Sequence, residues 1–161
     1  MSFTFPTILS HSADDAGVVI AALERQVGCY RGLAKLAERQ HEHVLADHTE
    51  GLLEVLKERE AVLDEAAGLE RTIGPAKRDW AAFTGRLPVD QRKRAEAAVG
   101  ETRRLLAEIT AGDERDALAL QQRKHRIGSE IRATASATAV NRNYAASAYG
   151  RNRPSQLDQT T

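Results

Sequence analysis

Apolar residues recur along the first half of the chain at alternating spacings of three and four residues. The first run of this stripe is Ile20, Leu23, Val27, Tyr30, Ala34 and Ala37. This spacing places the side chains on one face of an α-helix. No proline interrupts 7–74, and long helices require its absence from their interiors. We therefore predict a helical arm over residues 12–73 that opens near Ser12.

The stripe weakens between His41 and His48 and resumes at Leu52. Asp47 and Thr49 are residues of the type that caps a helix N-terminus. A kink or a tight turn is therefore predicted near 45–49.

A second proline-free arm covers residues 88–149 and starts with Pro88, which suits the first turn of a helix. Its stripe is Ala95, Ala98, Thr102, Leu105 and Ile109. Gly112 and Asp113 mark a weak point, where Asp113 is expected to cap a new helix. The apolar face then continues through Ile127 and Ile131.

The stretch between the arms, residues 74–87, is predicted to be a connection. It opens with Gly74-Pro75 and contains a short helical turn with Trp80 and Phe83. The tail, residues 150–161, is rich in polar residues and is predicted to be disordered. The predicted fold is all-α, a single domain over residues 1–149 that forms an elongated antiparallel coiled-coil bundle of three to four helices.

Composition supports helices and excludes several other classes. The chain has 161 residues, of which 27 are alanine and only 4% are aromatic. This composition disfavours a β-sandwich or an α/β enzyme, because both need many β-branched and aromatic residues. The net charge is zero, which gives no support for nucleic-acid binding. Residues 1–74 carry a net charge of −6 and residues 75–161 carry +6, so we expect the two arms to pack antiparallel to each other.

Neither a signal peptide nor a membrane span is expected, because the longest apolar run is Val18 to Leu23. The simplest localisation is cytoplasmic. The lone cysteine, Cys29, cannot form an intramolecular disulfide, and it is interpreted as a small helix residue rather than a nucleophile.

Catalytic motifs are absent: the chain has no Gly-rich phosphate loop, no nucleophile elbow and no HExxH. We therefore expect no enzymatic activity and no cofactor. The histidines His41, His43 and His48 lie close together, and Glu38 and His41 form an ExxH, the ligand spacing of di-iron bundles. A di-iron site needs a second ExxH, which the chain lacks, so solvated or interfacial histidines are favoured over a metal site.

Residues 131–149 are dominated by Ala, Ser, Thr and Asn and contain no acidic side chain. They are interpreted either as a frayed helical end or as a small-residue surface onto which another helix packs.

The pattern resembles the FlgN family of flagellar export chaperones. The similarity is carried by Leu33-x-x-Leu36-x-x-Arg39, Val44-Leu45-x-Asp47 and the repeat from Leu52 to Leu63, followed by Ile127-x-x-x-Ile131 and Asn141-x-Asn143-Tyr144. The terminal helix of the family carries more leucine, whereas this one is rich in alanine.

The resemblance implies a cytoplasmic, non-enzymatic chaperone. Its partners would be the C-terminal helical segments of hook–filament junction (hook-associated) proteins, kept from premature assembly and delivered to the flagellar export gate. The client-binding residues implied are Ile127, Ile131, Val140, Asn141, Asn143 and Tyr144. A homodimer is compatible with this function. The alternative hypothesis is a coiled-coil scaffold or adaptor that associates with itself and has no secreted client.

Overall fold

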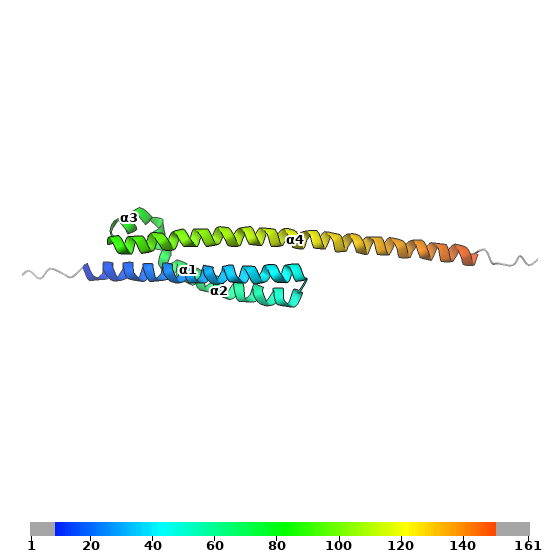
Figure 1. Ribbon diagram of the computed structural model, residues 1–161, viewed down its shortest axis with the longest axis horizontal. Helices are drawn as coiled ribbons and strands as arrows, with labels where there is room; N and C mark the ends of the chain where they lie inside the picture. Colours follow the sequence, from blue (N-terminus) through cyan, green and yellow to red (C-terminus); the bar gives the residue numbers. More distant parts are fainter. Residues whose placement is uncertain (1–8, 151–161) are drawn as a thin grey trace, which may run out of the picture. The chain divides into compact units, whose positions relative to one another are not determined.

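The computed structural model describes the backbone of residues 9–150 and the side chains of residues 15–147. Four helices follow one another: α1 (Leu9–Ala46), α2 (Thr49–Arg78), α3 (Trp80–Gly85) and α4 (Val89–Gly150) (Figure 1). The part of the chain that the structure describes contains no strand. The all-α fold predicted from the sequence is thus confirmed. The predicted disordered tail, apart from Gly150 at the end of α4, lies outside the described residues.

The chain divides into two compact units, one up to Ala117 and the other from Leu118 onward. The first unit contains α1, α2, α3 and the first part of α4. The second unit contains the rest of α4. The dividing point lies inside a continuous helix, where the sequence pattern shows no linker.

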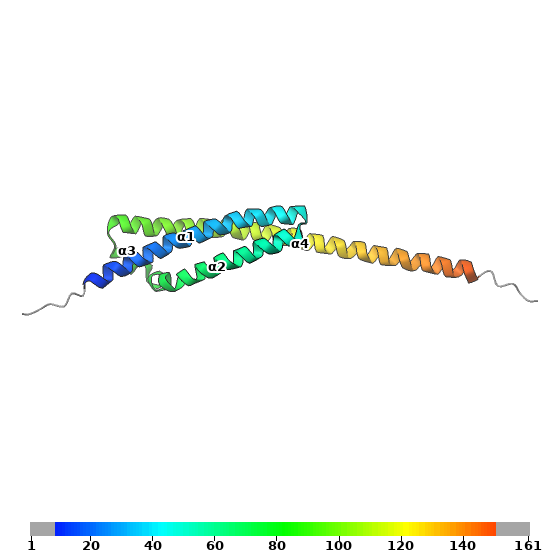
Figure 2. The ribbon, with the colours of Figure 1, turned by 90° about the horizontal axis from the view of Figure 1, so that it is seen from below.

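In the first unit, α1 and α2 run antiparallel to each other, side by side (Figures 1 and 2). Arg25 of α1 pairs with Glu65 of α2, whereas Arg39, further along α1, pairs with Glu58, which comes earlier in α2. Residue numbers of the partners in α2 therefore fall as residue numbers in α1 rise, which shows that the two helices run in opposite directions.

Helix α1 runs parallel to the first part of α4, which differs from the predicted antiparallel packing of the two arms. Glu24 pairs with Arg94, and Arg31 pairs with Glu101 seven residues further along both helices. The reason is that the first arm folds back on itself at residues 47–48. Only its second half, α2, can then run antiparallel to α4. In the Glu24–Arg94 pair the acidic residue is on the acidic first arm, as the charge asymmetry predicts. In the Arg31–Glu101 pair the acidic residue is on the basic second arm. The net charges of the two arms therefore do not determine their orientation.

The core of the first unit joins large aliphatic side chains of α1 to small side chains near the start of α4. Ile20, Leu23 and Val27 of α1 belong to one buried cluster with Ala95 and Ala98 of α4. Fully burying an aliphatic side chain of this size contributes about 1.5–3 kcal/mol. The cluster is completed by Ile73 and Ala76 of α2, by Phe83 of α3, and by Leu87, Leu105 and Ala22.

The turn between α1 and α2 confirms the predicted break near 45–49. Asp47 has a φ of 58°, in the left-handed region that ends many helices. Neither Asp47 nor Thr49, the predicted caps, occupies the N-cap position of α2. That position is held by His48, which makes no side-chain capping hydrogen bond.

The predicted connection over 74–87 begins too early. Helix α2 passes through Pro75 and continues to Arg78. An internal proline costs a helix about 3 kcal/mol, but Ile73 and Ala76 on either side of it are buried in the core, and this burial offsets the cost. The predicted helical turn with Trp80 and Phe83 is confirmed as α3, whose N-cap Asp79 accepts a hydrogen bond from the Ala82 amide at 3.1 Å.

The predicted break at Gly112-Asp113 is wrong, because α4 is continuous from Val89 to Gly150. Asp113 does not cap a helix; its carboxylate accepts hydrogen bonds from Arg59 of α2. The start of this helix agrees with the prediction, since Pro88 directly precedes α4 and its carbonyl accepts from the Arg92 amide.

Candidate functional site

The second unit exposes apolar side chains that follow a helical stripe. Ile127 is 46% exposed and Ile131 is 63% exposed. In the first unit, by contrast, Leu105 and Ile109 of the same helix are buried. This exposed stripe on α4 is the candidate functional site.

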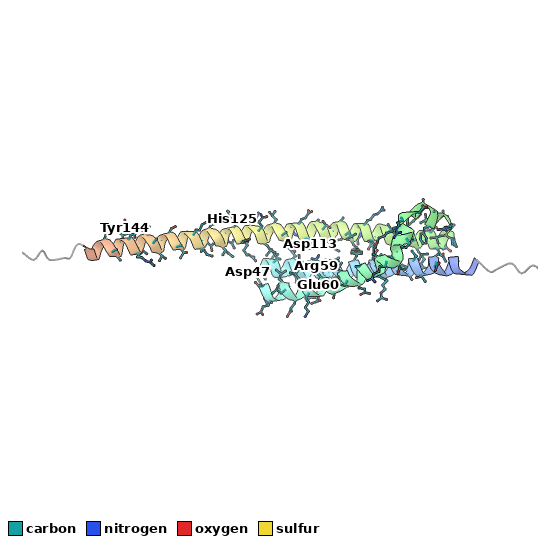
Figure 3. All side chains as sticks on the ribbon, turned by 180° about the vertical axis from the view of Figure 1, so that it is seen from behind. Asp47, Arg59, Glu60, Asp113, His125 and Tyr144 are labelled. Carbon is teal, nitrogen blue, oxygen red and sulfur yellow. The ribbon has the colours of Figure 1, made fainter. Side chains whose placement is uncertain are left out.

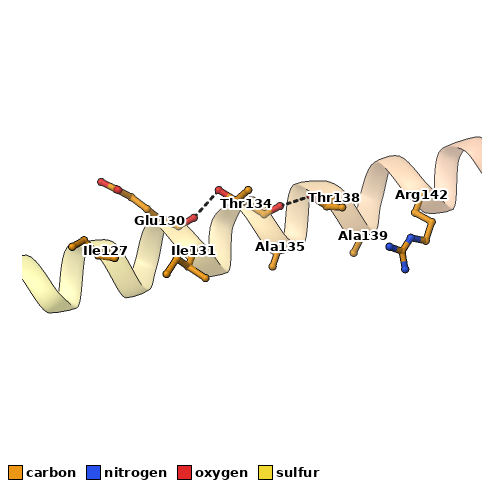
Figure 4. Close-up of a pocket in the computed structure, with 8 residues that line it drawn as sticks. All are labelled: Ile127, Glu130, Ile131, Thr134, Ala135, Thr138, Ala139 and Arg142. Carbon is orange, nitrogen blue, oxygen red and sulfur yellow. Dashed lines mark hydrogen bonds between the residues drawn. The ribbon is translucent and has the colours of Figure 1, made fainter.

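The eight residues that line this surface form a shallow depression on one side of α4 (Figure 4). They are Ile127, Glu130, Ile131, Thr134, Ala135, Thr138, Ala139 and Arg142. We call this surface the 127–142 face. Its side chains recur every three or four residues, the spacing with which one helix presents a face to another.

The two threonines of the 127–142 face need no polar partner from outside. Thr134 Oγ1 donates to the Glu130 carbonyl oxygen at 2.9 Å, and Thr138 Oγ1 donates to the Thr134 carbonyl oxygen at 2.9 Å (Figure 4). A threonine that satisfies its hydroxyl on the preceding turn can lie in an apolar contact without leaving an unpaired donor. The middle of the face is therefore suited to apolar packing.

The six residues predicted to bind a client all lie on α4, and the four apolar or aromatic ones are exposed. They do not share one side of the helix. Ile131 and Val140 are nine residues apart, which is about two and a half turns, so they point in opposite directions. Ile127 and Ile131 lie on one side, and Asn141 lies at the edge of that side, three residues before Tyr144.

The other three predicted residues lie on the opposite side of the helix. Val140 and Tyr144 are one turn apart, and Asn143 lies beside them. Tyr144 is 74% exposed (Figure 3). The structure thus brings the six residues to one helix but divides them into two sets.

The second unit is strongly basic over its described side chains. Residues 118–147 contain five Lys or Arg side chains and one acidic side chain, a net charge of +4. That acidic side chain, Glu130, lies 3.9 Å from the Arg126 guanidinium. Both side chains are about 70% exposed, so this pair contributes little to stability.

A polar layer crosses the first unit and was not recognised from the sequence. It joins Gln40 and His41 of α1, Arg59 of α2, and Asp113 and Asp116 of α4. Figure 3 labels Arg59 and Asp113 of this layer. Arg59 donates from Nη1 and Nη2 to the two carboxylate oxygens of Asp113, both at 2.6 Å. Two parallel bonds between a guanidinium and a carboxylate form the strongest common type of ion pair.

The interior of this layer is saturated by its own members. Asp116 is 2% exposed; one of its oxygens accepts from Gln40 Nε2 at 3.0 Å, and the other lies 2.6 Å from His41 Nδ1. Gln40 also accepts from Arg59 through Oε1 at 2.6 Å. Because each buried polar group has a partner, the layer favours one register of the three helices over others that would break these bonds.

The sequence signal for this layer was weak. Gln40 and Asp116 occupy buried positions of apolar stripes, and a polar residue at such a position is the usual mark of a register-setting contact. The partner of each residue lies on another helix, so no local spacing connects them.

The three clustered histidines lie in two separate environments. His41 contacts Asp116, whereas His43 and His48 contact each other through Nδ1 atoms 3.1 Å apart at the α1–α2 turn. Gly51 lies against this pair, and a Cβ at this position would come within 2.7 Å of both rings. Over the residues that the structure describes, no group of three or more His, Cys, Asp or Glu side chains is placed to hold a metal ion.

Cys29 is buried, with a relative exposure of 7%. Burial, followed by the negative charge of Glu65, raises the pKa of the Cys29 thiol. A thiol with a raised pKa is a poor nucleophile at neutral pH. This agrees with its interpretation as a small helix residue.

No helix in the described part of the chain is long and apolar enough to cross a membrane. No protein-family model, curated protein or solved structure matches the chain. The function is therefore argued from the geometry of the site.

Proposed function

We propose that the chain is a cytoplasmic export chaperone of the flagellar type, which binds a C-terminal helical segment of a hook–filament junction protein on α4. The observation that supports this proposal is the exposed 127–142 face, an apolar stripe on a helix. An exposed amphipathic helix face is a common binding surface for a second helix.

The physical task of such a chaperone suits this surface. The terminal segments of axial proteins have apolar stripes of their own and associate when they meet. A chaperone that covers the client stripe with its own 127–142 face prevents this association until export. Binding and release of a helix need no bond making or breaking, which agrees with a chain that has no catalytic motif.

The two sets of predicted residues have different roles in this proposal. Ile127 and Ile131 lie toward the N-terminal end of the 127–142 face and supply its large apolar side chains. Val140 and Tyr144 point to the opposite side of α4 and are exposed there. A single client helix cannot pack on both sides at once.

The test is titration calorimetry of the full chain against purified C-terminal segments of the hook–filament junction proteins of its source organism. We expect one-to-one binding, with helicity gained in circular dichroism. The double variant Ile127→Glu with Ile131→Glu should weaken binding about tenfold or more, because it replaces the two large apolar side chains of the face with charges that the client helix would bury.

The matched control is Val140→Glu with Tyr144→Glu, which adds the same charge to the same helix on the other side. It should bind the client with nearly unchanged affinity. Equal loss in both double variants would show that the client does not use the 127–142 face. Absence of binding to every segment would overturn the chaperone proposal.

The alternative, a scaffold that associates with itself, uses the same exposed stripe. Sedimentation of the chain alone distinguishes the two functions. A chaperone should sediment as a single low-order species whose mass is unaffected by Ile131→Glu. A scaffold should form larger assemblies that this substitution disrupts.

A further inference from the structure

We infer that the occupant of the 127–142 face is a helix that carries large aliphatic residues along its centre and acidic residues near both ends. This inference rests on the proposed function, because it assumes that the face receives a helix, and it adds the chemical character of that helix. It follows from the sizes and the charges of the side chains on the face.

The size argument comes from the packing of the same helix in the first unit. There Ala95 and Ala98 of α4 belong to one buried cluster with Ile20 and Leu23 of α1. Small residues on α4 are thus matched by large aliphatic residues on the helix that packs against it. Interiors are close-packed, so the same match is needed wherever a small-residue face is covered.

The 127–142 face repeats this pattern toward the C-terminus. Thr134, Ala135, Thr138 and Ala139 form its centre, and the threonine hydroxyls are satisfied by α4 itself. A partner with alanine at the facing positions would pack at a shorter interaxial distance but would bury less apolar surface. Leucine, isoleucine or valine on the partner buries more apolar surface against these small residues.

The charge argument comes from the two ends of the face. Lys124 and Arg142 lie seven residues before and eleven residues after Ile131, which is close to two and three whole turns. They are therefore in line with Ile131 and bracket the apolar centre. The distance from Lys124 to Arg142 along the helix is about 27 Å. A partner helix with a carboxylate opposite each of these residues therefore needs about 18 residues or more.

The charges disfavour a second copy of this chain as the occupant. A second copy of residues 118–147 brings a net charge of +4 against the same net charge. In an antiparallel pair Lys124 would meet Arg142, and in a parallel pair each would meet itself. Like charges at facing positions oppose association. An acidic helix satisfies the same positions favourably.

An anionic membrane also attracts basic helices, but this face is poorly suited to it. Helices that lie in a membrane surface present Trp, Phe or Leu to the lipid. The centre of the 127–142 face consists of Thr and Ala. We therefore assign the face to a protein helix.

The experiment uses fluorescence anisotropy with the full chain and three synthetic helical peptides of about 20 residues. The acidic peptide has leucine on one face and glutamate near both ends. The second peptide has lysine in place of the glutamates, and the third has alanine in place of the leucines. The acidic peptide should bind, and each of the other two should bind about tenfold more weakly or less.

A charge exchange provides the specific test. The double variant Lys124→Glu with Arg142→Glu should lose affinity for the acidic peptide and gain it for the lysine peptide. The control, Lys57→Glu with Lys93→Glu, makes the same change in net charge at exposed positions of the first unit. It should leave the preference for the acidic peptide in place. If both variants came to prefer the lysine peptide, the preference would depend only on the net charge of the chain, and the inference would be overturned.

Other outcomes also decide the matter. The inference would be overturned if all three peptides bound equally well or if none of them bound. It would also be overturned if the chain associated with itself through the face, or if it bound vesicles of anionic phospholipid more tightly than the acidic peptide. If the hook–filament segments bound the Lys124→Glu, Arg142→Glu variant as tightly as the unchanged chain, the inference would be refuted but the proposed function would stand. Binding of the acidic peptide without binding of any hook–filament segment would do the reverse.

Discussion

The two parts of α4 have the same local structure but very different surroundings. In the first part, Ala95, Leu105 and Ile109 are buried against other helices. In the second part, Ile127 and Ile131 continue a stripe with helical spacing, yet both are exposed. Burial in this helix is therefore decided by the presence of a partner and not by the spacing of apolar residues.

This difference has an energetic consequence. The stability of the first part comes from apolar burial and from the polar layer around Asp116. The second part depends mainly on intrinsic helix propensity, which is favoured by its alanines but is weak without tertiary packing. A partner helix would supply the missing burial and would stabilise the segment on binding.

The largest expected effect comes from truncating one large residue in each part of α4. Leu105→Ala should lower the free energy of unfolding by about 2–5 kcal/mol, because Leu105 is buried in the core. Ile131→Ala should change it by no more than about 0.5 kcal/mol, because Ile131 is already in contact with solvent. Chemical denaturation monitored by circular dichroism measures both. Similar losses in the two variants would mean that the second part is packed in the free protein.

A smaller effect is expected from the polar layer. Arg59→Ala should cost about 1–3 kcal/mol, because it leaves the Asp113 carboxylate and the Gln40 amide oxygen without their main donor. Arg132→Ala is the control in the second unit, where the guanidinium contacts only the Ser129 hydroxyl at 3.3 Å. Its effect should be within about 0.5 kcal/mol. A negligible change in the Arg59→Ala variant would show that the layer does not hold the three helices in register.

The smallest effect is on the pH dependence of stability. Hydrogen bonds from Gln26 and then from Lys77 lower the pKa of Glu70 below its ordinary value of 4.5. A carboxyl whose pKa is lower in the folded state contributes stability that is present above pH 4.5 and is lost as the pH falls through the folded value. Glu70→Gln should therefore reduce the loss of stability on acidification below about pH 4.5. An unchanged acid transition in this variant would refute the assigned interactions.

The elements that the sequence predicts well are those whose signal is local. The break at Asp47 follows from the interruption of the stripe, and α3 follows from the short helical turn predicted around Trp80 and Phe83. The helical class follows from the spacing of three and four residues. Each of these features is decided by residues within a few turns of one another.

The features that could not be predicted depend on distant residues. Pro75 remains inside α2 because Ile73 and Ala76 are buried by other helices. The free energy of this burial depends on residues distant in the sequence, so the local sequence around Pro75 does not predict it. Asp113 looks like a helix cap until Arg59 of another helix is placed beside it. The parallel arrangement of α1 and α4 follows from the reversal at residues 47–48.

The candidate site was predicted in part. The sequence pointed to the segment of α4 that carries the exposed stripe, but it combined residues from both sides of the helix into one surface. The helical periodicity already separated Ile131 from Val140, since nine residues span about two and a half turns. The use of this face for binding stays a prediction.

The central claim is that the second part of α4 has an exposed face that is completed by a partner helix. Hydrogen exchange of the full chain, followed by mass spectrometry with and without the acidic peptide, tests this claim most directly. The account predicts that amides in 118–147 exchange much faster than those of the first unit in the free protein. They should become protected when the peptide is added, while exchange in the first unit changes little. Strong protection of 118–147 in the free protein, or peptide binding that protects only the first unit, would contradict the account.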